Sequence, residues 1–170
     1  SGSNQITINP SSNLASSTQY YLQIPTTAFD DPSSNSFAGI SDTTSLSFTT
    51  ADVINPSITG PSGSAGNSTS TKSFNENSTA IHTFLANETV TWSLNGGADS
   101  SKFAINTSTG ALSFSSSPDY ESPTDSNSDN DYIVVVRATD LANNTSDQTL
   151  TISVADLDER LSLGPNNTPT

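Results

Sequence analysis

The sequence predicts an all-β fold, an antiparallel β-sandwich, and three observations support this prediction. Short runs of alternating apolar and polar residues recur along the chain, and Thr, Val and Ile fill many of them. Clusters of Asn, Gly, Asp, Ser and Pro separate the runs, as turns separate strands. No segment shows the periodicity of an amphipathic helix.

The first fifty residues contain three predicted strands. They cover residues 4–9, 19–24 and 44–49. In the third run, Leu46 and Phe48 share one face because successive strand residues point to opposite sides. Three strands bury little apolar surface alone, and a block of about 50 residues is near the lower limit for an independent core.

The second part of the chain contains about seven predicted strands. Residues 51–72 are rich in Pro, Gly, Ser and Thr and indicate a domain boundary, whose first part could also open the next domain. The predicted strands lie near residues 57–60, 80–85, 89–94, 102–106, 110–114, 131–138 and 147–155. Their spacing is typical of a β-sandwich. Alternation predicts this core: Trp92, Leu94, Phe103, Ile105, Leu112 and Phe114.

Composition and charge exclude several classes of function. The 170 residues include 17 acidic and 4 basic side chains, which give a net charge of −13 that repels nucleic acid. No apolar run approaches the ~20 residues that span a bilayer. Without Cys there is no disulfide framework, zinc ribbon or thiol nucleophile. The single histidine, His82, is expected at the surface or rim of the sandwich. An enzyme is therefore the least favoured of the functions.

Acidic residues of the second part gather at predicted strand ends. Carboxylates that meet at one pole of a sandwich repel each other unless a cation neutralises them. Calcium suits such a group because it accepts about six to eight oxygen ligands in flexible geometry. The candidate calcium ligands are Glu76, Asp119, Glu121, Asp140, Asp156, Asp158 and Glu159. Asp125, Asp129, Asn130 and Asp131 do not match the EF-hand spacing, and a solvated loop is favoured over a second metal loop there.

Residues 55–159 resemble a cadherin-like repeat of large bacterial surface proteins, a Greek-key β-sandwich. Phe74-Asn75-Glu76-Asn77 resembles the family's Pro-Glu-Asn motif, and Pro118-Asp119-Tyr120-Glu121 resembles its Asp-Arg-Glu motif. Asp140 ends a run similar to the strand that closes with Ala-x-Asp, and residues 156–159 resemble the Asp-x-Asn-Asp-Asn linker. The resemblance implies that these acids bind calcium. Ala86-Asn87-Glu88 replaces the family's Asp-x-Asp motif.

Residues 4–50 resemble the latter half of a bacterial Ig-like module. The similarity lies in Ile6-Thr7-Ile8-Asn9-Pro10, in residues 20–24 and in residues 46–50. Such modules occur in surface-layer and motility proteins, which implies a secreted protein at the bacterial cell surface. The expected organisation is a partial Ig-like module at 1–52, a cadherin-like domain at 53–159 and a tail at 160–170.

Two functions from different classes follow from this sequence. The first is a calcium-stiffened structural or adhesive module, whose partners are neighbouring β-sandwich modules or copies of itself, with surface glycans or proteins as further partners. The second is a self-assembling subunit of a filament or surface layer, in which strands of a neighbouring copy complete the partial module. A glycan-binding module resting on Tyr20, Tyr21 and Trp92 is a third reading.

Overall fold

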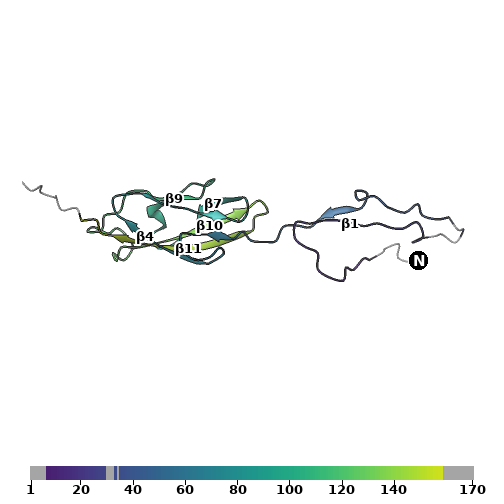
Figure 1. Ribbon diagram of the computed structural model, residues 1–170, viewed down its shortest axis with the longest axis horizontal. Coiled ribbons are helices and arrows are strands. Elements are labelled where there is room, and N and C mark those ends of the chain that lie inside the picture. Colours follow the sequence, from purple (N-terminus) through teal and green to yellow (C-terminus); the bar gives the residue numbers. More distant parts are fainter. Residues whose placement is uncertain (1–6, 30–32, 34, 159–170) are drawn as a thin grey trace, which may run out of the picture. The chain divides into compact units, whose positions relative to one another are not determined.

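The protein consists of two compact units in the computed structural model, Ser1–Ile54 and Asn55–Thr170 (Figure 1). The structure describes residues 7–29, 33 and 35–158. All of the strands in this part are short or of medium length, and its one helix is the 3-10 turn η1, Ser100–Lys102. No helix of the described residues is long and apolar enough to cross a membrane.

The described part of the first unit contains little regular secondary structure. Strands β1 (Gln19–Tyr21) and β2 (Ser47–Thr49) form an antiparallel pair, and Ile24 forms an isolated bridge with Ile40. The rings of Tyr20 and Phe48 stack with centroids 5.9 Å apart. None of the residues described in this unit is buried. Of the strand predicted at 4–9, residues 7–9 are described and are not in a strand.

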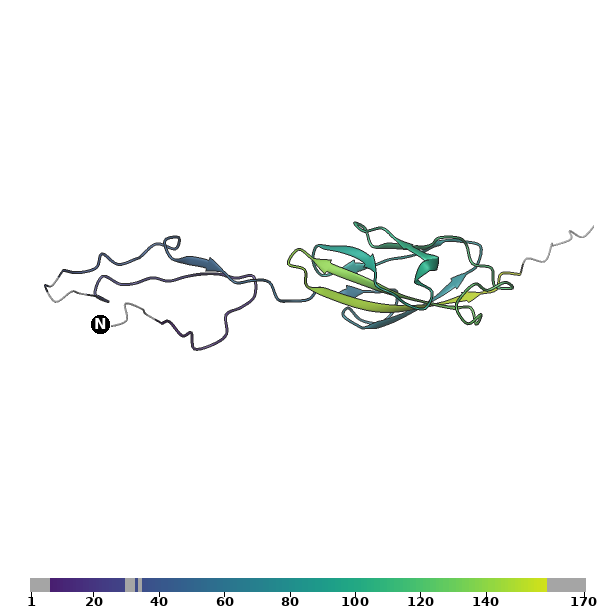
Figure 2. The same cartoon turned by 180° about the vertical axis from the view of Figure 1, so that it is seen from behind.

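The second unit is a β-sandwich with one four-stranded and two smaller sheets. The large sheet has the order β4-β11-β10-β7, from strands Thr69–Asn75, Thr145–Ala155, Asp131–Asp140 and Val90–Leu94. The opposing layer contains β5-β9-β8, from Ala80–Thr83, Ala111–Phe114 and Phe103–Ile105. The pair β3-β6 joins Ile58–Thr59 to Leu85–Ala86. Figure 2 shows β10 and β11 running the length of this unit.

Apolar side chains of both layers form one core. Residues of β10 alternate between half-buried and buried, as expected for a strand with one face on the core. Phe103 and Phe114 pack with ring centroids 4.7 Å apart, and Tyr132 meets Phe114 edge-on at 5.1 Å. The predicted core is confirmed: Trp92, Phe103, Leu112 and Phe114 are buried, and Leu94 and Ile105 pack against them.

Strand β4 differs from the prediction. The segment 51–72 was expected to be a boundary, yet Thr69–Asn75 pairs along its whole length with β11. This pair is parallel, whereas the other described pairs are antiparallel, as predicted for the whole sandwich. The alternation of β4 is hidden because its buried positions are Ser70 and Phe74, and only one of them is apolar.

Candidate metal centre

Three segments meet at one end of the second unit because β4 and β11 run in parallel. Asn75 lies opposite Ala155 in the register, so Glu76 and Asp156 emerge from neighbouring strand ends. The amide of Glu76 donates to the carbonyl of Ala155 over 3.3 Å. The amide of Asn77 donates to the carbonyl of Pro118 over 3.1 Å, which brings in the loop that follows β9. We call this end of the unit the acidic pole.

Glu76 lies at the centre of the acidic pole and is buried, with 1% of its surface exposed. Its Oε2 accepts a hydrogen bond from the Tyr120 amide over 2.7 Å, and its Oε1 accepts one from the Leu157 amide over 2.8 Å. A buried carboxylate is tolerated when such donors satisfy it. Glu76 therefore fixes the segment that carries Asp119 and Glu121 and the segment that follows β11.

Asp119 and Glu121 are exposed and complete the cluster. One carboxylate oxygen from each of Glu76, Asp119 and Glu121 lies within 4.8 Å of the others. The Asp119 carboxylate also accepts the Ser122 amide over 3.1 Å, which holds the side chain in a local turn. The three ligand atoms are thus held by a strand end and by one short loop.

Partial desolvation and the charges of the acidic pole together raise the pKa of Glu121. Its own backbone amide lowers that pKa, but partial desolvation and neighbouring negative charge outweigh the amide and leave the pKa above its usual value. The neighbouring charges belong to the carboxylates of Glu76, Asp156 and Asp119. Asp156 therefore belongs to the same electrostatic cluster.

This donor set fits a hard cation. All of the candidate ligand atoms are carboxylate oxygens, which calcium prefers, and the exposed positions of Asp119 and Glu121 leave room for water ligands. The ion pair that the structure describes, Arg137 with Asp147 at 2.7 Å, lies on β10 and β11 and is not part of the cluster. Carboxylates held this close gain stability from any cation that binds between them.

Asp140 lies apart from the acidic pole, although the sequence placed it with the other acids. Strand β10 runs antiparallel to β11, so the end of β10 lies beside the start of β11. Asp131 begins β10 opposite Ser153, near the end of β11 that leads to the acidic pole. Asp140 is nine residues further along β10, which corresponds to about 30 Å. The carboxylate of Asp140 accepts the amides of Ala142 and Asn144, each over 2.8 Å, and thereby caps the β10–β11 turn.

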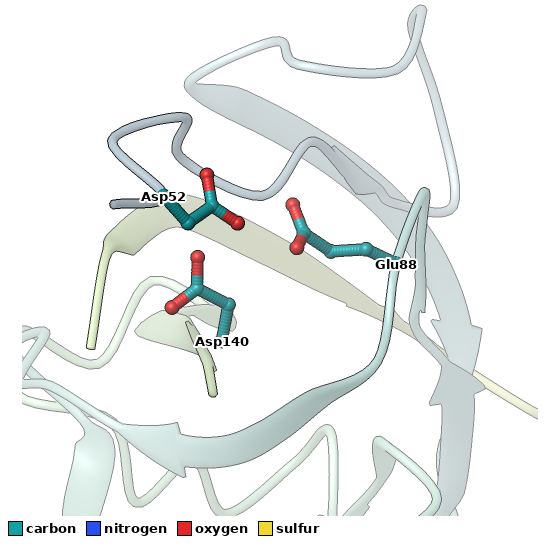
Figure 3. Close-up of side chains that lie close together, drawn as sticks. All are labelled: Asp52, Glu88 and Asp140. Carbon is teal, nitrogen blue, oxygen red and sulfur yellow. The ribbon is translucent and has the colours of Figure 1, made fainter. Parts of the chain in front are cut away.

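Glu88 is the residue near Asp140 that the sequence prediction did not include. A carboxylate oxygen of Glu88 lies within 4.8 Å of one from Asp140. Figure 3 draws these two side chains; the third side chain drawn, Asp52, belongs to the first unit. Strand register could have revealed the pair, because Asp140 lies opposite Val90 and Glu88 is two residues before it.

The remaining predicted ligands follow β11. Asp158 is exposed, and Glu159 lies outside the described residues.

In the loop predicted to be solvated, Asp125 is instead buried, with 7% of its surface exposed. His82 is half-buried, and its ring meets Phe84 edge-on at 5.1 Å. Burial and the charge of Lys72 lower the pKa of His82.

Comparisons with known proteins support both resemblances. Residues 1–50 match the family model of the bacterial Ig-like domain. Among solved structures, repeats EC21-23 of human CDH23 share 18% identity over 67% of this chain and 38% of that one, with a TM-score of 0.50. This likeness shows the fold alone. No curated protein sequence is similar enough to count as a match.

Two further cadherin structures match with lower TM-scores. The protocadherin gammaB7 EC3-6 cis-dimer structure has 20% identity and a TM-score of 0.49, and the match covers 62% of this chain and 24% of that one. The third cadherin domain of human protocadherin 7 has 23% identity and a TM-score of 0.44, over 60% of this chain and 99% of that one. The chain thus spans well under half of the multi-repeat fragments.

Proposed function

We propose that this chain, which joins a bacterial Ig-like segment to a β-sandwich with the cadherin fold, is a calcium-stiffened structural or adhesive module of a bacterial surface protein. Families with these folds are typically structural and extracellular, which fits a location at the cell surface. We further propose that the chain is not an enzyme. The observation that carries the proposal is the acidic pole, where Glu76, Asp119 and Glu121 converge.

Calcium at the acidic pole would add coordination bonds between segments that Glu76 already joins. Glu76 holds the Tyr120 and Leu157 amides, while Asp119, Glu121 and Asp156 supply uncompensated negative charge around it. A bound ion would replace mutual repulsion with shared coordination. We propose that Asp158 and Glu159 add ligands from the segment after β11, so that binding stiffens that segment.

At the other end of the second unit, Glu88 and Asp140 form a smaller acidic pair. Their carboxylates lie within 4.8 Å of each other, and the Asp140 carboxylate is already bonded to the β10–β11 turn. We propose that this pair also takes part in calcium binding. Its ligands come from one rigid turn and one strand start, which would favour binding without rearrangement.

Calorimetric titration of the full chain with calcium tests the proposal. The double variant Asp119→Asn/Glu121→Gln removes two ligand charges while keeping side-chain size, so it should weaken binding at the pole at least tenfold. The control Asp42→Asn/Asp147→Asn removes the same charge from residues that are not members of the cluster and should bind as the unchanged chain does. Equal calcium binding by both double variants would refute the calcium site at the acidic pole.

The alternative function, a self-assembling subunit, is favoured by the apolar surface of the first unit. Ile8, Tyr21 and Phe48 are 57%, 54% and 55% exposed, and they line one shallow pocket. A two-stranded sheet is only marginally stable in water, so an added strand from a second copy would cover this face and complete the sheet.

Light scattering distinguishes the two functions. A subunit should form polymers whose mass rises with concentration, and Phe48→Ser should return it to a monomer. Leu141→Ser is a matched control because Leu141 is 88% exposed in the second unit. A monomer at all concentrations would exclude the assembling subunit and leave the calcium-stiffened module.

A further inference from the structure

Two buried side-chain oxygen atoms in the loop between β9 and β10 lack hydrogen-bond donors. Asp125 is buried, with 7% of its surface exposed, and its Oδ2 accepts the Asp129 amide over 2.9 Å. Its other oxygen, Oδ1, is also buried and has no hydrogen-bond donor. The bond from Asp129 shows that the Asp125 side chain turns into the loop formed by residues 125–131.

Asn130 presents a second unsatisfied oxygen in the same loop. Its Nδ2 donates to the Tyr120 carbonyl over 3.0 Å, which fixes the orientation of the side-chain amide. Its Oδ1 is buried and has no donor. Two acceptors cannot satisfy each other, so both oxygens need an added donor or a cation.

The charge around the loop favours a cation over water. Asp125, Asp129 and Asp131 lie within seven residues, and no Lys or Arg occurs between residues 103 and 136. Asp99 adds a fourth carboxylate beside the loop, because it accepts the amides of Ser126 and Ile133 over 2.7 and 2.9 Å. Water would satisfy the two acceptors but would leave this charge uncompensated.

We propose that the loop of residues 125–131 binds one calcium ion through Asp125 Oδ1 and Asn130 Oδ1. Loop carbonyls and water would complete the oxygen shell that calcium requires. The spacing Asp125, Asn127 and Asp129 equals the first three ligand positions of an EF-hand loop, but Val136 stands where that loop has its bidentate Glu, so the full EF-hand spacing is absent, as the sequence indicated. Asn130 occupies the position of the conserved glycine and has the left-handed φ of 66° that this position demands.

This site is separate from the acidic pole but is connected to it. Tyr120 accepts the Asn130 amide through its carbonyl and donates its own amide to Glu76. Tyr120 also lies between the two exposed ligands of the pole, Asp119 and Glu121. An ion in the loop therefore holds the segment that presents those ligands, so the pole should bind calcium more tightly when the loop is filled.

Amide NMR spectra of the full chain, titrated with calcium from a chelator-treated start, test the proposal. The side-chain amide of Asn130 and the backbone amides of residues 126–131 should shift along one saturable curve. They should shift also in Asp119→Asn/Glu121→Gln, because the loop does not use those side chains. Calorimetry should find one ion fewer in Asp125→Asn than in the charge-matched control Asp42→Asn.

If the loop amides of the unchanged chain do not shift, the proposal is overturned and the two buried oxygens are assigned to water. The same ion count in Asp125→Asn and Asp42→Asn would also overturn it. If Asp125→Asn fails to fold, the spectra of the unchanged chain and of Asp119→Asn/Glu121→Gln still test whether the loop binds calcium. Loop shifts without any shift at the Tyr120 and Leu157 amides would support the loop site while refuting the calcium site at the acidic pole.

Discussion

At the residue scale, Glu76 has a structural role that does not depend on calcium. Its two oxygens satisfy the amides of Tyr120 and Leu157 inside the fold. Glu76→Ala leaves both donors without an acceptor and should lower the free energy of unfolding by about 2–4 kcal/mol in chelator. Urea denaturation measures this loss, and Glu121→Ala serves as a control at the same pole. Equal stabilities of the two variants would contradict the role assigned to Glu76.

Glu121 should affect stability in the opposite direction when no cation is present. Its pKa is raised in the folded state, so the folded chain binds the proton more tightly than the unfolded chain does. The ionised carboxylate therefore lowers the free energy of unfolding at pH 7. In chelator, Glu121→Gln should therefore melt above the unchanged chain at pH 7. The difference should shrink as the pH falls through the raised pKa and disappear below the usual value of 4.5. A difference that does not change with pH would contradict this account.

At the scale of elements, the turn before β9 depends on Gly110. Gly110 has a φ of +72°, and an added Cβ would lie 2.8 Å from the Phe84 carbonyl oxygen and 2.9 Å from the Trp92 ring. Gly110→Ala should cost about 2–4 kcal/mol, because it combines backbone strain with a clash against the core. Gly96→Ala is the control, since its φ is +105° but nothing lies within 4 Å of the added Cβ. Denaturation midpoints that fall equally for both variants would contradict the clash.

The pairing of β10 with β11 includes one ion pair on its outer face. Arg137 lies opposite Asp147 in the register and donates to it over 2.7 and 2.8 Å. Both side chains are over a third exposed, so Asp147→Asn should cost only about 0.2–1 kcal/mol at pH 7.

The hydrogen bonds from Arg137 lower the pKa of Asp147, so this contribution has a defined pH range. It is fully present above the usual value of 3.8 and is lost as the pH falls through the lowered pKa. Melts of Asp147→Asn and of the unchanged chain should differ constantly from pH 7 to 5 and converge in stronger acid. Persistence of the difference in strong acid would show that the pair does not act through charge.

The sequence predicted those elements whose buried positions are apolar. Strands β7, β10 and β11 alternate clearly, and the structure confirms them within a few residues. Strand β4 was missed because Ser70 fills a buried position, and its parallel partner β11 lies far along the chain. Strand direction also determines which acids lie together: the sequence alone could not separate Asp140 from the acids that follow the parallel strands β4 and β11.

At the scale of the whole molecule, the two units contribute different properties. The second unit has one continuous core and the acidic pole, whereas the described part of the first unit has exposed apolar side chains and no buried residue. The loop at 125–131 shows a further limit of sequence reasoning. Its acids have the composition of a solvated loop, and only the structure shows that Asp125 and the Oδ1 of Asn130 are buried.

The most direct test of the central claim is thermal unfolding of the full chain in calcium and in chelator. At a calcium concentration of about 100 times Kd, binding at the acidic pole should add about 2.7 kcal/mol, which corresponds to a rise in Tm of roughly 10 °C. Asp119→Asn/Glu121→Gln should keep only the part of the rise that the loop site provides, and Asp42→Asn/Asp147→Asn should keep all of it. The same Tm for the unchanged chain in calcium and in chelator, or a full rise in the polar double variant, would contradict a calcium site at this pole.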